Sequence, residues 1–210
     1  MFNETVNAAS TVVNQTLNYL STDFFSRILA ILEAPIKNPQ MLWMLLPLLA
    51  TAILIEFYFG RYKDEELGWN TAYGNALVLA FISIDLLRHT YEPLGLTIRD
   101  AIFVGNSKIF VALIIFSFAL LLLFIDFFHF LPKKLAYAIS SPAYINFLGL
   151  IGIMLVYSSK IPLDWTTFGA CLVILILFII IAELLYLMVP THHSPINRIL
   201  TVDDKEKKKN

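Results

Sequence analysis

The chain has 210 residues, of which 58% are hydrophobic, with a net charge of −1 and a mean hydropathy of +0.73. Soluble globular domains average about 45–50% apolar residues, and the excess here falls in long uninterrupted blocks, which excludes an ordinary water-soluble domain. The single cysteine, Cys171, excludes a disulfide framework or a thiolate metal site within one chain. We therefore expect an all-α fold, a polytopic integral membrane helical bundle of about five transmembrane helices.

Residues 1–38 are predicted to form an N-terminal amphipathic helix. Apolar side chains recur at helical steps of three and four, opposite a polar face of Asn, Thr, Ser and Gln. The stripe comprises Phe2, Val6, Ala9, Val13, Leu17, Leu20, Phe24, Ile28 and Ile31. Because Arg27 is the first basic residue, we expect no cleavable signal peptide. The helix should lie on the membrane surface or against another membrane protein, and Pro35 and Pro39 should break it.

The first two spans are expected over about residues 41–59 and 72–89. The first contains Pro47, and Glu56 lies near its end. The second is the weaker, because its strongly apolar part ends at Leu87 and is only about 16 residues long, below the ~20 residues that cross a bilayer. A re-entrant segment is therefore the alternative for this stretch.

The third span, over about residues 108–131, is the most continuous, and it carries Asp126 and His129 near its end. The fourth is expected over about 143–158, where Gly149 and Gly152 would let another helix approach closely. The fifth is expected over about 165–189. The bundle would thus occupy residues 39–190.

The distribution of Lys and Arg predicts the orientation. With five spans, nine basic residues fall on the C-terminal side and six on the other. By the positive-inside rule this places the C-terminus in the cytoplasm and the N-terminus outside, in the cell membrane. Residues 191–210 should form a basic, disordered cytoplasmic tail. The expected partners are the lipid bilayer and other membrane proteins bound through residues 1–34, with no nucleic acid.

Ionisable residues inside spans cost roughly 2.5–3.5 kcal/mol each at a helix centre, so they are candidates for function. Four of them, Glu56, Asp126, His129 and Glu183, are expected at similar depth near the cytoplasmic ends of their helices. Asp126 and His129, at i and i+3, would share one helical face. One hypothesis is a shared proton, cation or metal site. The alternative is that each group reaches the interface or pairs with a nearby basic residue.

A second polar cluster, Asp85, Arg88 and His89, is predicted on one face of the second span at the opposite side of the membrane. Asp85 and Arg88 can neutralise each other within their helix. A gate or a partner contact is the alternative.

No zinc-protease helix, nucleophile elbow, phosphate-binding loop or dinucleotide fingerprint occurs in the sequence. The sequence therefore names no catalytic residue and no cofactor, and it argues against an enzyme. Our first functional hypothesis is a non-enzymatic structural or interaction component of the membrane. The alternative is a small ion- or proton-coupled transporter or channel that uses the acidic and histidine residues near the cytoplasmic ends of its spans.

Overall fold

The computed structural model describes residues 10–16, 19–62, 68–92, 95, 97–103, 106–158 and 160–190. Over these ranges the regular structure is helical and contains no strand, which confirms the all-α prediction. Five helical segments in the described chain are long and apolar enough to cross a membrane, as the sequence predicted. The expected N-terminal residues 1–9 and the expected tail 191–210 lie outside the described residues.

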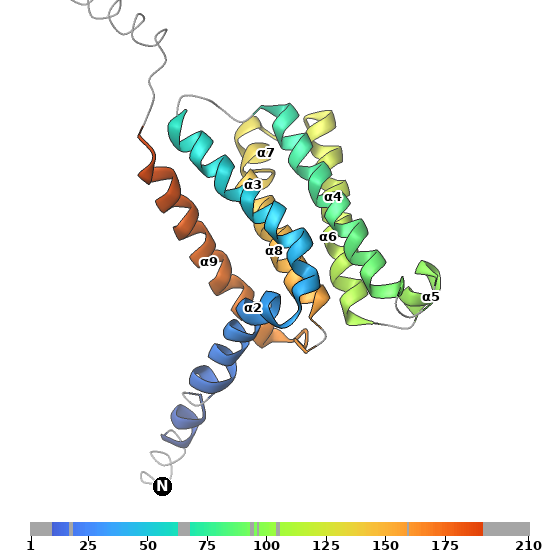
Figure 1. Cartoon of the computed structure of the whole chain (residues 1–210), viewed down its shortest axis with the longest axis vertical. Helices are drawn as coiled ribbons and strands as arrows, with labels where there is room; N and C mark the ends of the chain where they lie inside the picture. Colours follow the sequence, from blue (N-terminus) through green and yellow to red (C-terminus); the bar gives the residue numbers. More distant parts are fainter. Residues whose placement is uncertain are drawn as a thin grey trace, which may run out of the picture.

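Five long helices run alternately up and down the bundle (Figure 1). They are α3 (Leu42–Arg61), α4 (Trp69–Tyr91), α6 (Ser107–Phe128), α8 (Pro142–Tyr157) and α9 (Trp165–Met188). The shorter elements are a helix over 10–16, a π-helical turn η1 (Tyr19–Phe24), α2 (Phe25–Lys37), a 3-10 turn η2 (Pro39–Met41), α5 (Ile98–Phe103) and α7 (Lys133–Ile139). We call the two ends of the bundle the α5 end and the α7 end. Helices α3, α6 and α9 finish at the α7 end.

Helix α4 is continuous over 23 residues. At 1.5 Å per residue it is about 35 Å long, more than the ~30 Å hydrocarbon core. Gly68 adopts an extended backbone conformation, and the helix begins at the next residue, Trp69. The residues from Trp69 to Thr71 therefore add about one turn before the strongly apolar stretch. The length of α4 therefore favours a full span over the re-entrant alternative.

Helix α8 is the centre of the bundle. Helices α4 and α6 pack on one side of it and α3 on the other, with α9 against α3. The two glycines expected to allow close approach do so: a Cβ added to Gly149 would lie 2.8 Å from a Leu48 methyl group, and one added to Gly152 would lie 2.6 Å from an Ile115 methyl group. The helix has only 16 residues, and Ser141 caps its start.

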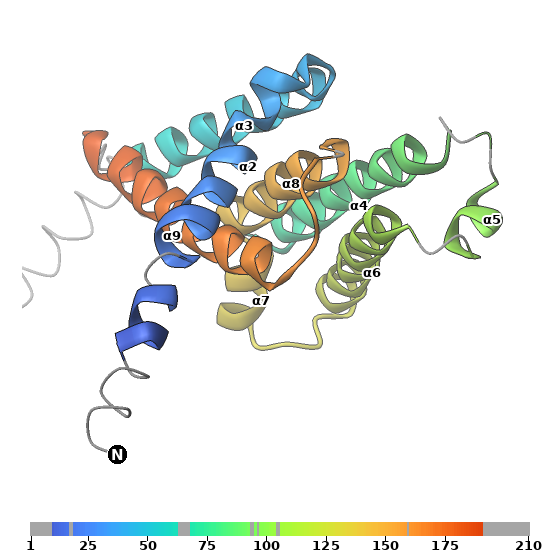
Figure 2. The same cartoon turned by 90° about the horizontal axis from the view of Figure 1, so that it is seen from below.

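Helix α2 packs at the α5 ends of α8 and α9, and the helix over residues 10–16 that precedes it extends away from the bundle (Figures 1 and 2). The C-terminal part of the predicted apolar stripe packs on α8 and α9 of the same chain, through the buried Ile28 and Ile31 and the neighbouring Ala34. The expectation that Pro35 breaks the helix is wrong. It lies in the last turn, and α2 ends two residues later at Lys37.

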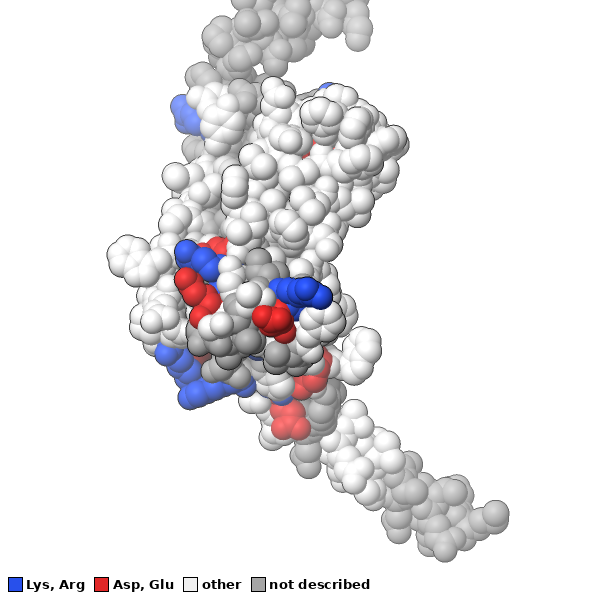
Figure 3. Space-filling model, turned by 90° about the vertical axis from the view of Figure 1, so that its right-hand side faces the viewer, with Lys and Arg blue, Asp and Glu red and all other residues white. Residues whose placement is uncertain are grey.

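The outer surface of the bundle is strongly apolar. Helix α9 is the clearest case, because only 6% of its most apolar window is buried within the described chain. On the face that carries α4, α5 and α6, charged side chains gather toward the α5 end, and the surface toward the α7 end is mostly uncharged (Figure 3). This pattern is the one expected of helices surrounded by lipid.

Candidate functional site

Asp126 is the most deeply buried charged residue in the described part of the spans, with 2% of its surface exposed. It lies two residues before the end of α6. The Ser140 hydroxyl donates a 2.8 Å hydrogen bond to its Oδ2. Its Oδ1 is also buried, and no donor among the described residues reaches it. A carboxyl group with one oxygen held and the other open can take up a proton or accept a further donor.

Ser140 connects Asp126 to a third helix. It lies in the turn between α7 and α8, and its carbonyl oxygen accepts a 2.9 Å hydrogen bond from the Asn75 side chain on α4. The polar chain Asn75–Ser140–Asp126 therefore joins α4, α8 and α6 at the α7 end. Because Asn75 and Ser140 carry no charge, this chain of hydrogen bonds does not neutralise the Asp126 carboxyl group.

His129 is not on the helical face predicted for it. Helix α6 ends at Phe128, and His129 follows as its C-cap in the left-handed conformation, with φ 55°. Histidine is among the non-glycine residues that adopt this conformation more readily. The exposed imidazole ring contacts the Trp69 ring, with centroids 4.1 Å apart and the two planes tilted by 59°. His129 still lies close enough to Asp126 to interact with its charge. The two residues are therefore neighbours, although they do not share a helical face.

Glu56 and Glu183 form a separate pair. They lie on α3 and α9, close enough for their carboxylates to repel each other. The two helices approach tightly here, because a Cβ added to Gly60 would lie 2.7 Å from the Tyr186 carbonyl oxygen. Glu56 is partly buried and Glu183 is exposed.

The four acidic and histidine residues near the α7 end thus divide into two pairs. No group of three or more His, Cys, Asp or Glu side chains in the described chain lies close enough together to hold one metal ion. The hypothesis of one metal site built from all four residues is therefore not supported by the arrangement of Glu56, Asp126, His129 and Glu183.

At the α5 end of α4, Asp85 and Arg88 form the ion pair that the sequence suggested, at 2.8 Å. Tyr157, at the end of α8, donates a second 2.8 Å hydrogen bond to the other Asp85 oxygen. The Tyr157 ring stacks flat on His89, with centroids 3.7 Å apart. Tyr157 was not among the site residues predicted from the sequence; its position at the end of the fourth predicted span was the signal for an interfacial hydrogen-bonding role.

Lys108 was also missed as a structural residue. Its ammonium group donates to the carbonyl oxygens of Leu155, at 2.6 Å, and Ile161, at 2.7 Å. These oxygens belong to the end of α8 and the loop that follows, so Lys108 caps a helix across the bundle. A cation at a helix C-terminus is favoured by the helix dipole.

Asp164 fastens α2 to the start of α9. Its Oδ1 accepts a hydrogen bond from the Thr167 backbone N–H at 2.8 Å, and its Oδ2 lies 3.2 Å from the Arg27 guanidinium group of α2. The pKa of Asp164 is lowered, mainly by the backbone hydrogen bond from Thr167 and also by Arg27.

No family model, no curated protein and no solved structure matches this chain. The roles of these residues are therefore argued from their geometry alone.

Proposed function

We propose that this protein is a non-enzymatic membrane component that holds a neighbouring membrane protein through α2. The observation that carries the proposal is a second apolar stripe on α2, on the side that faces away from the bundle. It consists of Phe25, Leu29, Leu32 and Ile36, spaced by four, three and four residues. Ile36 is 80% exposed and Phe25 is 57% exposed. Nothing in the described chain covers this stripe.

The position of α2 supports contact with a protein. Helix α2 lies at the α5 ends of α8 and α9, and the helix over residues 10–16 that precedes it extends away from the bundle (Figure 2). Helices that rest on anionic lipid usually carry Lys and Arg on their polar face, and the sequence before Arg27 contains neither. An apolar partner surface suits an uncharged amphipathic helix better than a lipid headgroup layer does.

Helix α2 is also held rigidly. The Arg27–Asp164 ion pair fixes its first turns to α9, and the Asn38 side chain donates a 2.9 Å hydrogen bond to the Tyr157 carbonyl oxygen just after its end. A helix held at both ends presents its outer stripe without further ordering, which reduces the entropic cost of binding.

Site-specific photo-crosslinking in native membranes tests the proposal. A photoreactive amino acid at Ile36 should give a discrete protein adduct. The same amino acid at Leu54, which is 66% exposed on α3 in the middle of the bilayer, should give lipid adducts only. The proposal then requires that Leu29→Asn abolish the adduct at position 36 while the bundle stays folded. Lipid adducts alone at position 36 would contradict it.

Coupling to protons or a monovalent cation is a second candidate function, and the open Oδ1 of buried Asp126 favours it. In proteoliposomes, Asp126→Asn should then abolish uptake driven by a pH or sodium gradient, while the matched change Asp100→Asn in α5, outside the spans, should not. Flux that is absent in the unmodified protein, or equal in both variants, would exclude this function.

A further inference from the structure

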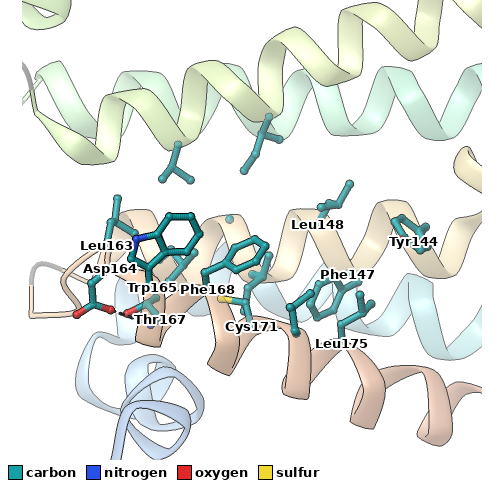
Figure 4. Close-up of a pocket in the computed structure, with 16 residues that line it drawn as sticks. Tyr144, Phe147, Leu148, Leu163, Asp164, Trp165, Thr167, Phe168, Cys171 and Leu175 are labelled. Atoms are coloured by element: carbon teal, nitrogen blue, oxygen red, sulfur yellow. Dashed lines mark hydrogen bonds between the residues drawn. The ribbon is translucent and has the colours of Figure 1, made fainter. Parts of the chain in front are cut away.

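A groove of about 640 Å³ lies between α6, α8 and α9 (Figure 4). It exists because α9 packs on α3 and α2, whereas α6 packs on α4 and α8, so α6 and α9 stand apart over the surface of α8. Its size falls within the ~300–1,000 Å³ typical of ligand sites. The groove faces the lipid side of the bundle and is separate from the outer stripe of α2.

The walls of the groove are apolar for nearly their whole length. Val111 and Ile115 of α6 face Phe168 and Cys171 of α9, and Ile151 of α8 forms part of the floor. In Figure 4, Trp165 and Asp164 lie together at one end and Tyr144 lies at the other. Only the end beside Asp164 is strongly polar, so the groove has the polarity of a lipid, with one polar end and a long apolar body.

The length of the groove matches one leaflet. On α9 it extends from Trp165 to Leu175, and on α8 from Leu155 to Tyr144. At 1.5 Å per residue these stretches are roughly 15–17 Å long, about half of the ~30 Å hydrocarbon core. A helix of another protein that crossed the bilayer would need the full depth, whereas a hydrocarbon chain needs only one leaflet.

Two cations are bonded to residues that line the groove. The Lys108 ammonium group binds the carbonyl oxygen of Leu155, itself a groove residue, and has no carboxylate within ion-pair distance in the described chain. It has three N–H donors, and the two carbonyl oxygens use two of them. Arg27 is paired with the groove residue Asp164, and its Nε is buried without a hydrogen-bond acceptor among the described residues. The two cations are thus bonded to groove residues that supply one carboxylate between them.

From this match we infer that the groove binds one hydrocarbon chain of a phospholipid from the leaflet at the α5 end, with the lipid phosphate held near Lys108. The phosphate accepts the remaining Lys108 donor and balances the charge of Lys108. The chain fills the apolar groove and completes the surface that α6 and α9 leave open.

Native mass spectrometry of the full chain tests the inference. The protein is released from nanodiscs that contain equal amounts of phosphatidylglycerol and phosphatidylcholine. One retained phospholipid is expected, enriched in the anionic phosphatidylglycerol. Cys171→Phe, which fills the groove, should lower retention on the order of tenfold. Ile181→Phe is the control, because Ile181 lies on α9, is 56% exposed and does not line the groove. Equal retention in the two variants, or retention of a second protein chain in place of lipid, would overturn the inference.

The only cysteine of the sequence gives a readout that needs no bulky substitution. Cys171 lines the groove, so its alkylation by N-ethylmaleimide in detergent should slow, and reach a limit, as phosphatidylglycerol is added. A Cys171→Ala, Ile181→Cys protein should show no such limit. Lys108→Gln should weaken the protection by phosphatidylglycerol. If protection is absent, or identical at positions 171 and 181, the groove does not hold a lipid.

Discussion

The two ends of the bundle differ in whether their acidic side chains form ion pairs with cations. At the α5 end the carboxylates of Asp85 and Asp164 each have a cationic partner, Arg88 and Arg27 respectively. At the α7 end Asp126 accepts a hydrogen bond from the Ser140 hydroxyl and lies near the exposed His129, and Glu56 lies near another carboxylate, Glu183. The α5 end is therefore arranged for stability and attachment, whereas the α7 end keeps carboxyl groups that the fold does not neutralise.

The largest effect is expected from breaking the network at the α5 end. Asp85→Ala removes the partner of both Arg88 and the Tyr157 hydroxyl group. Because Asp85 is about one-fifth exposed and Arg88 is well exposed, we expect a loss of about 2 kcal/mol of unfolding free energy. Unfolding in mixed detergent micelles measures it. Glu92→Ala is the control, since Glu92 is 69% exposed and 3.9 Å from Arg88, and it should cost less than about 0.5 kcal/mol.

A smaller effect is expected at the α7 end. Ser140→Ala removes the hydrogen bond to Asp126 and should cost about 1 kcal/mol. Asp126→Asn should cost no more than this, because the amide oxygen still accepts the Ser140 hydrogen and no ion pair to Asp126 is broken in the described chain. The same unfolding measurement applies. A loss for Asp126→Asn as large as that for Asp85→Ala would show that the two ends do not differ as described.

Relief of like-charge repulsion should have a favourable effect. Glu183→Gln removes one of the two neighbouring carboxylates on α3 and α9, and because Glu183 is exposed to solvent we expect only a small gain in unfolding free energy. Glu56→Gln should give a similar gain, and the double variant little more than either single one. Additive gains would mean that the two carboxylates act independently.

The smallest effect concerns acidification at the α5 end. Because the pKa of Asp164 is lowered in the folded protein, its stabilising contribution is complete above the unfolded value of about 3.9 and is lost as the pH falls through the folded value. A spin-label distance between α2 and α9 should therefore stay constant from neutral pH to about pH 4 and lengthen only below it. Asp164→Asn keeps the N-cap and should remove this dependence. A change near neutral pH would point to another group.

Much of the fold could be predicted from the sequence, because span length and helix period depend on residues that are close along the chain. The Asp85–Arg88 pair was found for the same reason. The position of His129 was not, since it depends on where α6 ends, and the helix stops at Phe128, ahead of Pro132, leaving His129 in a left-handed cap.

The sequence alone could not predict which helices lie next to each other in the bundle. Equal depth suggested that Glu56 and Asp126 could meet, but depth does not say which helices are neighbours, and α3 packs against α8 and α9 while α6 packs against α4 and α8. The same limit hid the hydrogen bonds of Lys108 and the groove, since both depend on contacts between α6 and segments more than forty residues away.

The shortness of α8 has a consequence for the fourth membrane-crossing segment. Sixteen residues give a helix of about 24 Å, several ångströms less than the hydrocarbon thickness of an average membrane. The segment reaches 25 residues, Lys133–Tyr157, only because α7 continues it beyond the turn at Ser140. An interruption inside a span frees backbone groups that neighbouring side chains must satisfy, and Asn75 of α4 does so at the Ser140 carbonyl oxygen. The fourth crossing therefore depends on its neighbour for integrity at the point where its own helix is broken.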